Sequence, residues 1–487
     1  MKRILIAGFI FCSVSTFAQK KNKIDPALQL VNSNKEATLA ALNSAYESDK
    51  KTALQIWDYA EVGYKETKSA ALHVQNLRAA GFTVETGVAE IPTAFVASYG
   101  SGAPVIGILA EYDALPGLAQ TASPEKTTIE GKNAGHGCGH HLFGTASVSA
   151  GIAIKNLIAA GKLKGTIKIY GCPAEEGGSG KVFLVRAGLF NGVDAVIHWH
   201  PDFYNGVTTM SALANKSAKF KFYGIAAHAS MLPEQGRSAL DAVEAMDNMV
   251  NMMREHIPQE TRIHYIITNG GKAPNVVPDF AEVYYYVRHP KRKDVVDIFD
   301  RVVKAAEGAA LGTGTTMKYD IIGGTHDLLI NKTLAEVMQT NLEKVGGIKY
   351  SEADYAFAKK IQPSFIGTKV DIATAATIKP LSYVNEGNNG STDVGDVSYA
   401  LPTVGMRAAT WVPGTPAHSW QAVAAGGTEI GTKGMLVASK AMTLTAIDLM
   451  SNPALLAKAM EEFNQSKGDY KYKALLGDIK PSLNYRD

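Results

Sequence analysis

The sequence has little cysteine, no long tract of one charge, and hardly any hydrophobic run that approaches membrane-spanning length. Three cysteines in 487 residues exclude a disulfide-stapled scaffold. The 49 basic and 46 acidic side chains nearly cancel, and no basic tract carries interleaved aromatic residues, so nothing in the composition supports binding to nucleic acid. With 46% hydrophobic residues, the chain can instead bury the cores of two or three globular domains.

Residues 1–18 follow the pattern of a secretory signal peptide. Lys2 and Arg3 form a short basic region, and residues 4–14 form an apolar run that is too short to span a bilayer. Residues 16–18 (TFA) are of the kind that signal peptidase recognises, so we expect cleavage after Ala18. The expected product is an exported, periplasmic protein with no membrane span. An uncleaved anchor or a buried strand is the alternative.

Helical and apolar patterns alternate along residues 19–212 and resume after residue 327. Ser33 and Glu36 form a capping box, which predicts that a helix begins there. Helices are expected to continue to about residue 80, and another follows His140. Apolar runs at 105–109, 166–170 and 195–199 are each followed by polar residues, which is typical of buried strands whose carboxyl ends form the functional edge of an α/β sheet.

Residues 213–326 carry a different pattern. Strands are expected at 216–223, 262–268, 281–287 and 315–322, with helices at 240–254 and 295–311. This β-α-β-β-α-β order indicates a ferredoxin-like α+β module. The predicted fold class is therefore α/β, with a domain on a central mixed sheet that comprises residues 19–212 and 327–487 and is interrupted by an inserted α+β domain at 213–326. Residues 461–487 are polar and indicate nothing further.

The densest chemical signal lies at residues 135–141 (GHGCGHH), where glycines separate one thiol from three imidazoles. A glycine-rich backbone can turn tightly and so direct Cys138 and His140 at one point. Thiolate and imidazole are ligands of zinc and of similar divalent metals. A disulfide between Cys138 and Cys172 is the alternative, since both remain after cleavage; otherwise Cys172 is a small apolar filler.

Paired carboxylates and paired imidazoles follow two of the predicted strands. Glu175 and Glu176 precede two glycines that permit a sharp turn, so one carboxylate can bind metal while the other takes a proton from water. His198 and His200 share one face of a strand, and His200 is nearer the functional edge. The plainer alternatives are an acidic surface turn and packed histidines.

Two weaker candidates complete the set. Glu111 and Asp113 follow the strand at 105–109, where their carboxylates could bind metal, orient a histidine ligand, or be solvated. His418 lies far downstream in a short polar stretch. Together the candidates favour a metal-activated water that attacks an amide.

With these motifs in order, the sequence resembles the M20 metallopeptidase and amidohydrolase family, in its branch of amino-acid amidohydrolases. The resemblance covers nearly all of the chain after residue 18. The matching stretches are EYDALP (111–116), GHGCGH (135–140), PAEEGG (173–178), HWHP (198–201), GIAAHA (224–229), NVVP (275–278), GSTDVGDVS (390–398) and PAHS (416–419).

The resemblance implies a dinuclear metal site, with two zinc or manganese ions per subunit. The implied ligands are Cys138, bridging the two ions, with His140, Glu176, His200 and His418. Glu175 would be the general base and acid, and Asp113 would contact one of the metal ligands and not the metal itself. His141 departs from the family pattern, which has an acidic or amide residue there.

The resemblance also implies that the inserted domain is a dimerisation, or lid, domain in a homodimer. His228 would reach the active site of the partner subunit and polarise the scissile carbonyl. Asn275 and Arg288 would hold the substrate, with Arg288 suited to a carboxylate. The plainer alternatives are a packed histidine and a solvated arginine.

The predicted function is hydrolysis of the amide bond of a small N-acyl or N-aroyl amino acid, such as an aroyl-glutamate, or of a dipeptide. One alternative is a cysteine amidase, with Cys138 as nucleophile and His140 as base. Another is a non-catalytic metal or peptide binder, which would not need a base such as Glu175. The sequence leaves open which acyl group is cleaved and which metal is bound.

Overall fold

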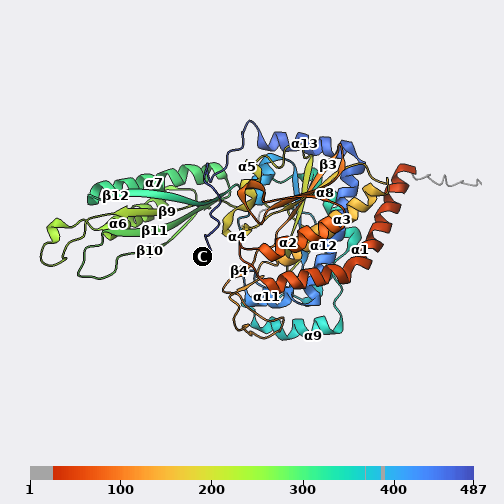
Figure 1. Cartoon of the computed structure of the whole chain (residues 1–487), viewed down its shortest axis with the longest axis horizontal. Coiled ribbons are helices and arrows are strands. Elements are labelled where there is room, and N and C mark those ends of the chain that lie inside the picture. The colour runs from red at the N-terminus through yellow and green to blue at the C-terminus, as the bar shows by residue number, and fades with distance from the viewer. Residues whose placement is uncertain (1–25, 368, 385–389, 487) are drawn as a thin grey trace, which may run out of the picture.

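The computed structural model describes residues 26–367, 369–384 and 390–486. A rounded body carries an arm that projects to one side, and the arm is the inserted part of the chain (Figure 1). The predicted signal peptide lies outside the described residues, as does its cleavage site.

The body is built on a seven-stranded mixed sheet, as the sequence predicts. The inner strands β6, β3, β7 and β13 run parallel, and antiparallel strands close both sides. Across the sheet the order is β1 (Thr83–Thr86), β2 (Phe95–Ser101), β6 (Gly165–Gly171), β3 (Val105–Ala110), β7 (Ala195–Asp202), β13 (Thr403–Ala409) and β8 (Gly206–Val207). The parallel strands thus place the ends of β6, β3 and β7 side by side.

Helices cover this sheet, and a two-stranded ribbon of β4 (Leu115–Pro116) and β5 (Ala134–Gly135) lies at its edge. Helix α3 packs against α12, and α1 packs against both (Figure 1). The helices of the body are α1 (Pro26–Tyr59), α2 (Thr67–Ala79), α3 (His140–Ala159), α4 (Glu175–Gly178), α5 (Gly180–Arg186), α8 (Lys332–Val345), α9 (Glu352–Ile361), α10 (Val394–Ala400), α11 (Trp420–Gly426), α12 (Glu429–Ser451) and α13 (Pro453–Lys467).

The predicted start of the first helix at Ser33 is wrong. Helix α1 begins at Pro26, and Ser33 lies in its second turn. A capping box stabilises a helix only where backbone donors are free, and here the preceding residues already have helical geometry.

Helix α3 is apolar because it lies in the core. Among the described residues it is the one helix that is long and apolar enough to cross a membrane, yet 72% of that apolar window is buried inside the fold. It packs against the sheet and against helices α1 and α12. A core position therefore explains its composition.

The arm has the predicted ferredoxin-like arrangement, with its own hydrophobic core. Its sheet has the order β10-β11-β9-β12, and every neighbouring pair is antiparallel. Along β11, buried and half-exposed residues alternate, as in a strand with one covered face. The elements are β9 (Ala214–Tyr223), α6 (Ala239–Met253), β10 (Arg262–Asn269), β11 (Phe280–His289), α7 (Arg292–Thr313) and β12 (Thr316–Thr325).

The arm also exposes apolar side chains. Ile266 on the edge strand β10 is 63% exposed, Met252 on α6 is 68% exposed, and Met231 in the loop after β9 is 72% exposed. Most of the large exposed apolar side chains among the described residues belong to the arm. Exposed apolar patches of this kind are typical of protein–protein contacts.

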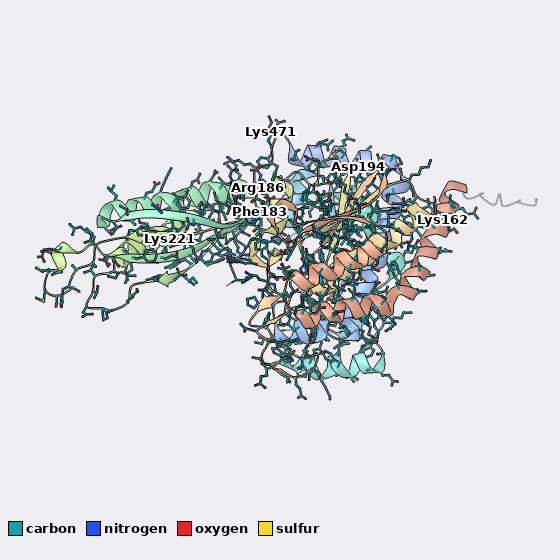
Figure 2. All side chains as sticks on the ribbon, in the orientation of Figure 1. Lys162, Phe183, Arg186, Asp194, Lys221 and Lys471 are labelled. Carbon is teal, nitrogen blue, oxygen red and sulfur yellow. The ribbon has the colours of Figure 1, made fainter. Side chains whose placement is uncertain are left out.

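The segment after α13 crosses the junction between body and arm. Leu475 and Leu476 lie against Gly324 near the end of β12, and Tyr472 donates to Asp396 of the body across 2.8 Å. Figure 1 shows the last, dark blue part of the chain running over this junction, and Figure 2 places Lys471 and Arg186 beside it. The prediction that residues 461–487 are uninformative is therefore wrong, because they carry part of α13 and this crossing segment.

Candidate metal centre

The candidate ligands converge at the carboxyl ends of β3, β6 and β7. Glu111 and Asp113 follow β3, Glu175 and Glu176 follow β6, and His200 lies near the end of β7. Because these strands are parallel neighbours, their ends meet at one edge of the sheet. A site at this edge follows from the topology.

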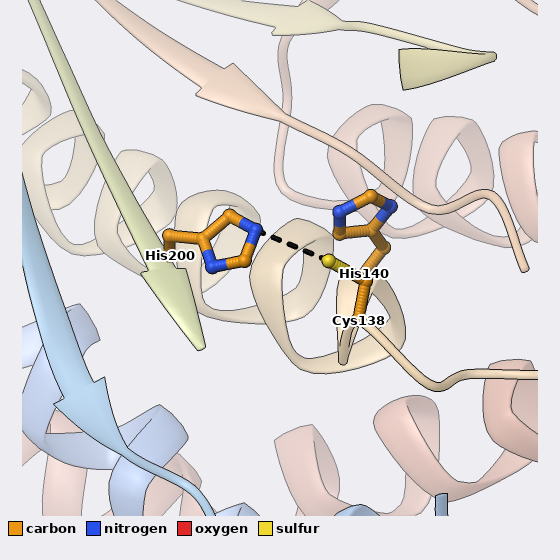
Figure 3. Close-up of side chains that lie close together, drawn as sticks. All are labelled: Cys138, His140 and His200. Atoms are coloured by element: carbon orange, nitrogen blue, oxygen red, sulfur yellow. Dashed lines mark hydrogen bonds between the residues drawn. The ribbon is translucent and has the colours of Figure 1, made fainter. Parts of the chain in front are cut away.

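Cys138 and His140 enter from the loop that begins α3. Gly139 stands between them with φ of +77°, a left-handed conformation that strains other residues, and a Cβ there would meet Pro201 at 2.7 Å. The thiol of Cys138 lies 3.3 Å from Nε2 of His200 (Figure 3). Nδ1 of His200 is 2.7 Å from the carbonyl of Pro201, so this nitrogen is the donor and Nε2 has a lone pair free toward the thiol.

A second group shares the same thiol. Cys138, Glu176 and His418 each offer one ligand atom, all within 4.8 Å of one another, as do Cys138, His140 and His200. Nε2 of His418 lies 3.0 Å from Oε1 of Glu176. The backbone N–H of His418 donates to the carbonyl of Gly137, which ties this distant loop to the cysteine motif. Cys138 therefore stands between two ligand groups.

Asp113 accepts hydrogen bonds from two of the candidate ligand residues. Its Oδ1 accepts from Nδ1 of His140 at 2.9 Å, and its Oδ2 accepts from the backbone N–H of Glu176 at 2.9 Å. In a metal-bound state the proton on Nδ1 would stay with Asp113, and the lone pair of Nε2 would face the site. Asp113 thus fixes both the imidazole and the Glu176 peptide.

Glu111 is closer to the site than its sequence pattern indicates. Its Oε2 lies 3.1 Å from Nε2 of His140, and its Oε1 accepts from Nζ of Lys181 at 2.6 Å. Lys181 is fully buried and also donates to Asp393 at 2.7 Å. Glu111, His140 and Glu175 form a third group that could hold a metal ion. The acidic pair after β3 was visible in the sequence, but nothing there showed which carboxylate faces the site.

The charges in this site oppose one another strongly. Burial lowers the pKa of His140, but Cys138, Asp113 and Glu111 outweigh it, so the pKa lies well above its usual value. Burial and then the carboxylates of Glu111 and Glu176 raise the pKa of Glu175. Burial, then Glu176, raises the pKa of the Cys138 thiol. So many acidic groups can ionise together only beside a cation.

The donor set fits divalent metal. Nε2 of His140 lies 3.1 Å from Oε2 of Glu111, and Oε1 of Glu176 lies 3.0 Å from Nε2 of His418. These carboxylate and imidazole atoms belong, with Cys138 and Glu175, to groups that could hold a metal ion. Thiolate, imidazole and carboxylate together suit zinc or a related ion, which would take the place of the proton on Nε2 of His140.

Other residues of the ligand motifs point away from the site. Nε2 of His136 and Nε2 of His141 meet the backbone carbonyls of Ile56 and Gly426, at 3.1 and 3.0 Å. Burial lowers the pKa of His198 to about 3, so it stays neutral in the core. Cys138 and Cys172 are both free, and Cys172 belongs to the hydrophobic core. The alternative of a disulfide is thereby excluded, and His141 acts in packing.

His228 and Asn275 lie away from this centre. Both are exposed, in two loops of the arm that meet where His228 pairs with Val276. These loops, at 224–238 and 270–279, form the tip of the arm, at the end remote from the body (Figure 1). Arg288 is at the opposite end of the arm, where its Nη1 donates to Ser391 of the body at 3.3 Å. Within one subunit the structure therefore places neither His228 nor Asn275 at the ligands.

Comparison with known proteins assigns the class. Residues 214–313, which form most of the arm, match the family described as the peptidase dimerisation domain of M20 proteins. The chain is 42% identical over 453 residues to one of the subunits of p-aminobenzoyl-glutamate hydrolase of Escherichia coli, covering 87% of this chain and 94% of the relative. The chain belongs to the M20 peptidase family, and it is a hydrolase of amide or dipeptide bonds.

More distant relatives show how far the likeness extends. Xaa-Arg dipeptidase of mouse is 30% identical over 429 residues, covering 84% of this chain and 87% of that protein. The fold matches the crystal structure of an aminobenzoyl-glutamate utilization protein from Klebsiella pneumoniae, with a TM-score of 0.62 at 17% identity over 84% of this chain and 97% of the other. It also matches a dinuclear metal-binding M20 peptidase from Bacillus subtilis, with a TM-score of 0.56 at 17% identity over 84% and 99%.

Proposed function

We propose that this chain hydrolyses the amide bond between a small acyl or aroyl group and an amino acid, such as glutamate, or the bond of a dipeptide. The observation that supports the proposal is that Cys138 belongs to two ligand groups, one of which shares His140 with the group that contains Glu175. The activities for which the relatives are named point the same way: p-aminobenzoyl-glutamate hydrolase, Xaa-Arg dipeptidase and, at 28% identity, hippurate hydrolase of Campylobacter jejuni.

Two divalent ions, zinc or manganese, would be held by five side chains: Cys138 between them, with His140, Glu176, His200 and His418. When bound, the ions lower the pKa of a water molecule and polarise the carbonyl of the substrate. Glu111 is the additional candidate near His140. Lys181 and Asp113 hold the surrounding carboxylates and imidazole in place.

Glu175 would move the proton. Its carboxylate belongs to the same group as Glu111 and His140, beside the implied ions, and this position makes it the base for the attacking water. The same carboxyl group would then protonate the leaving amine. A non-catalytic binder of metal or peptide has no use for such a group, which favours an enzyme.

The arm would complete the site of a second subunit. His228 is exposed, in a loop at the tip of the arm that is remote from the ligands of its own chain. In the proposed dimer, the partner subunit's His228 would stabilise the developing oxyanion. Asn275 shares that tip and would contact the same substrate. Arg288, at the junction, would bind the carboxylate of the leaving amino acid. The chain would therefore act as a homodimer.

The test joins metal analysis to a hydrolysis screen. The purified chain should contain zinc or manganese and should release free amino acids from a panel of N-aroyl-glutamates, N-acyl amino acids and dipeptides, as followed by mass spectrometry. Removal of metal with a chelator should abolish turnover, and re-addition should restore it. Full activity in the metal-free protein would instead support the cysteine amidase, with Cys138 as nucleophile.

We also propose that the protein is exported, on the pattern of residues 1–18. Cell fractionation and N-terminal sequencing of the mature chain check this. The expected outcome is a periplasmic protein that begins at Gln19. A cytoplasmic protein that begins near Met1 would contradict it.

A further inference from the structure

The turn that carries the two glutamates has an irregular backbone. Ala174 and Ser179 flank it with φ of +55° and +57°, and Gly177 within it has φ of +89°. Positive φ at non-glycine residues is strained, and the surrounding structure must hold such residues in place. Regular helical hydrogen bonds therefore do not fix the orientation of Glu175 and Glu176 by themselves.

The peptide groups of Glu176 are held from two sides. On the inner side its N–H donates to Asp113 at 2.9 Å. On the outer side its carbonyl oxygen accepts from the hydroxyl of Tyr485 at 2.9 Å and from Nη2 of Arg486. The two outer donors come from the segment after α13, about 300 residues further along the chain.

That segment is anchored where it meets the turn. The ring of Tyr485 packs edge-on against Tyr64, with 5.6 Å between ring centroids, and the hydroxyl of Tyr64 donates to Gly178 at 2.7 Å. The guanidinium of Arg486 lies over the ring of Tyr485. Tyr485 and Tyr64 thus hold both ends of the turn through one aromatic contact.

The hydroxyl of Tyr485 fits closely against Gly63, where there is no room for a side chain. A Cβ added at Gly63 would come within 2.1 Å of the hydroxyl of Tyr485. Upstream, Arg186 donates to the carbonyl of Gly477 at 2.8 Å, near the junction that Figure 2 marks with Arg186 and Lys471. These contacts fix the segment at Gly477 and at Tyr485, so that its end lies beside the Glu175–Glu176 turn.

We propose that Tyr485 and Arg486 are positioning residues that clamp the Glu175–Glu176 turn, so that Glu176 stays aimed at the metal and Glu175 at the water. The inference rests on the proposed role of Glu176 as a ligand. Neither residue contacts the reacting atoms. Hydrogen-bonded partners behind metal ligands commonly change metal affinity or activity by about 10–100-fold when they are replaced.

The test uses substitutions that remove the two donors and leave the packing. Tyr485→Phe keeps the ring against Tyr64, and Arg486→Gln removes the charge. Each single variant should lose zinc to a competing chelator about 10-fold more readily than the unchanged protein, and the double variant about 100-fold. Arg486→Lys should recover part of the loss. At saturating zinc, kcat should fall while KM stays within about twofold, because both side chains would act through the carbonyl oxygen of Glu176.

Lys480→Gln is the matched control. Lys480 lies on the same segment and pairs with Glu90, and both side chains are largely exposed. The control should keep zinc affinity and kcat within about twofold of the unchanged protein, as expected for a surface ion pair. Comparable melting temperatures of control and variants show that the segment has not simply unfolded.

A folded double variant whose zinc affinity and kcat stay within twofold of the unchanged protein would overturn the clamp. If the double variant does not fold, the single variants decide by the same criterion. If the unchanged chain binds no zinc or manganese, the proposed function fails. In that case amide exchange at Gly178 still decides the clamp: faster exchange in Tyr485→Phe supports it, and unchanged exchange overturns it.

Discussion

The body and the arm use their side chains in opposite ways. The body buries charge: Lys181, Glu111 and Asp393 form a fully enclosed network beside the candidate metal centre. The arm exposes apolar surface, with Ile266, Met252 and Met231 each more than half exposed. Both arrangements are costly for an isolated chain, since enclosed charge must be paired and exposed apolar surface favours association.

The difference indicates where each domain is incomplete. The side chains around His140 form groups that could hold a metal ion, so metal would complete the body. The apolar side chains of the arm are exposed, and the match to a dimerisation domain suggests that a second subunit covers them. Metal and partner would then meet at one site, because the tip of the arm carries His228.

The largest expected effect tests the chemistry of the body. Glu175→Gln should lower kcat by about 100-fold or more, since it removes the proton acceptor and keeps the shape of the side chain. Metal content and melting temperature should stay unchanged. Glu47→Gln, on the exposed side of α1, is the matched control and should keep full activity. Near-normal turnover by a metal-loaded Glu175→Gln protein would remove Glu175 from this role.

The next effect tests whether the arm serves the partner. His228→Ala should lower kcat by about 100-fold, as expected for the loss of an oxyanion donor, and should leave metal content intact. The exposed His256→Ala of the same domain is the control. Mixing His228→Ala with Glu175→Gln and allowing subunits to exchange should return up to about a quarter of the full activity, because a mixed twofold dimer has one complete site. No return after verified exchange means that His228 serves its own chain or only packs.

A smaller effect tests the apolar surface of the arm. Ile266→Glu places a charge on the edge strand β10 and should weaken dimerisation at least about 10-fold, as measured by analytical ultracentrifugation. Ile366→Glu is the matched control, because Ile366 is a fully exposed residue of the body. Equal dimerisation of both variants would place the subunit contact elsewhere.

The smallest effect compares two carboxyl groups with a raised pKa, one in each domain. Burial raises the pKa of Asp49 in the body to about 6, although a hydrogen bond from Ser149 lowers it. Burial likewise raises the pKa of Asp247 in the arm to about 6, although a hydrogen bond from Tyr285 lowers it. Between about pH 4 and 6 the unfolded chain releases protons that the folded chain keeps, so stability falls as pH rises through this window.

Replacement by asparagine removes this dependence. Asp49→Asn or Asp247→Asn should flatten the fall in melting temperature between pH 4 and 7 by about 2 °C. The exposed Asp297→Asn should leave the profile unchanged. A profile that keeps its slope in all three variants would show that these carboxyl groups do not set it.

Much of the fold could be predicted because the signals are local. Apolar runs fixed β3, β6 and β7, and the order of elements at 213–326 identified the ferredoxin-like arm. The candidate ligands of the body also gather as expected, in part because parallel strands bring their ends together: Cys138, His140, Glu175, Glu176, His200 and His418.

What the sequence did not reveal depends on contacts between distant segments. Nothing in the sequence distinguishes Glu111 from Asp113. The ion pair between Glu111 and Lys181, 70 residues later in the chain, distinguishes them in the structure. Tyr485 and Arg486 carry no motif, and their importance follows from one carbonyl oxygen at Glu176. Hydrogen bonds of this range leave no periodic pattern in a sequence.

The first and last strands of the arm pair with each other, and this has a practical consequence. Asn215 of β9 faces Thr325 of β12, and the two side chains are joined by a hydrogen bond of 2.9 Å. The chain therefore leaves and re-enters the body at a single point, so a short turn could span the excision of everything between them. Such a minimal body would separate two questions, because it keeps the candidate metal ligands and lacks His228 and Asn275.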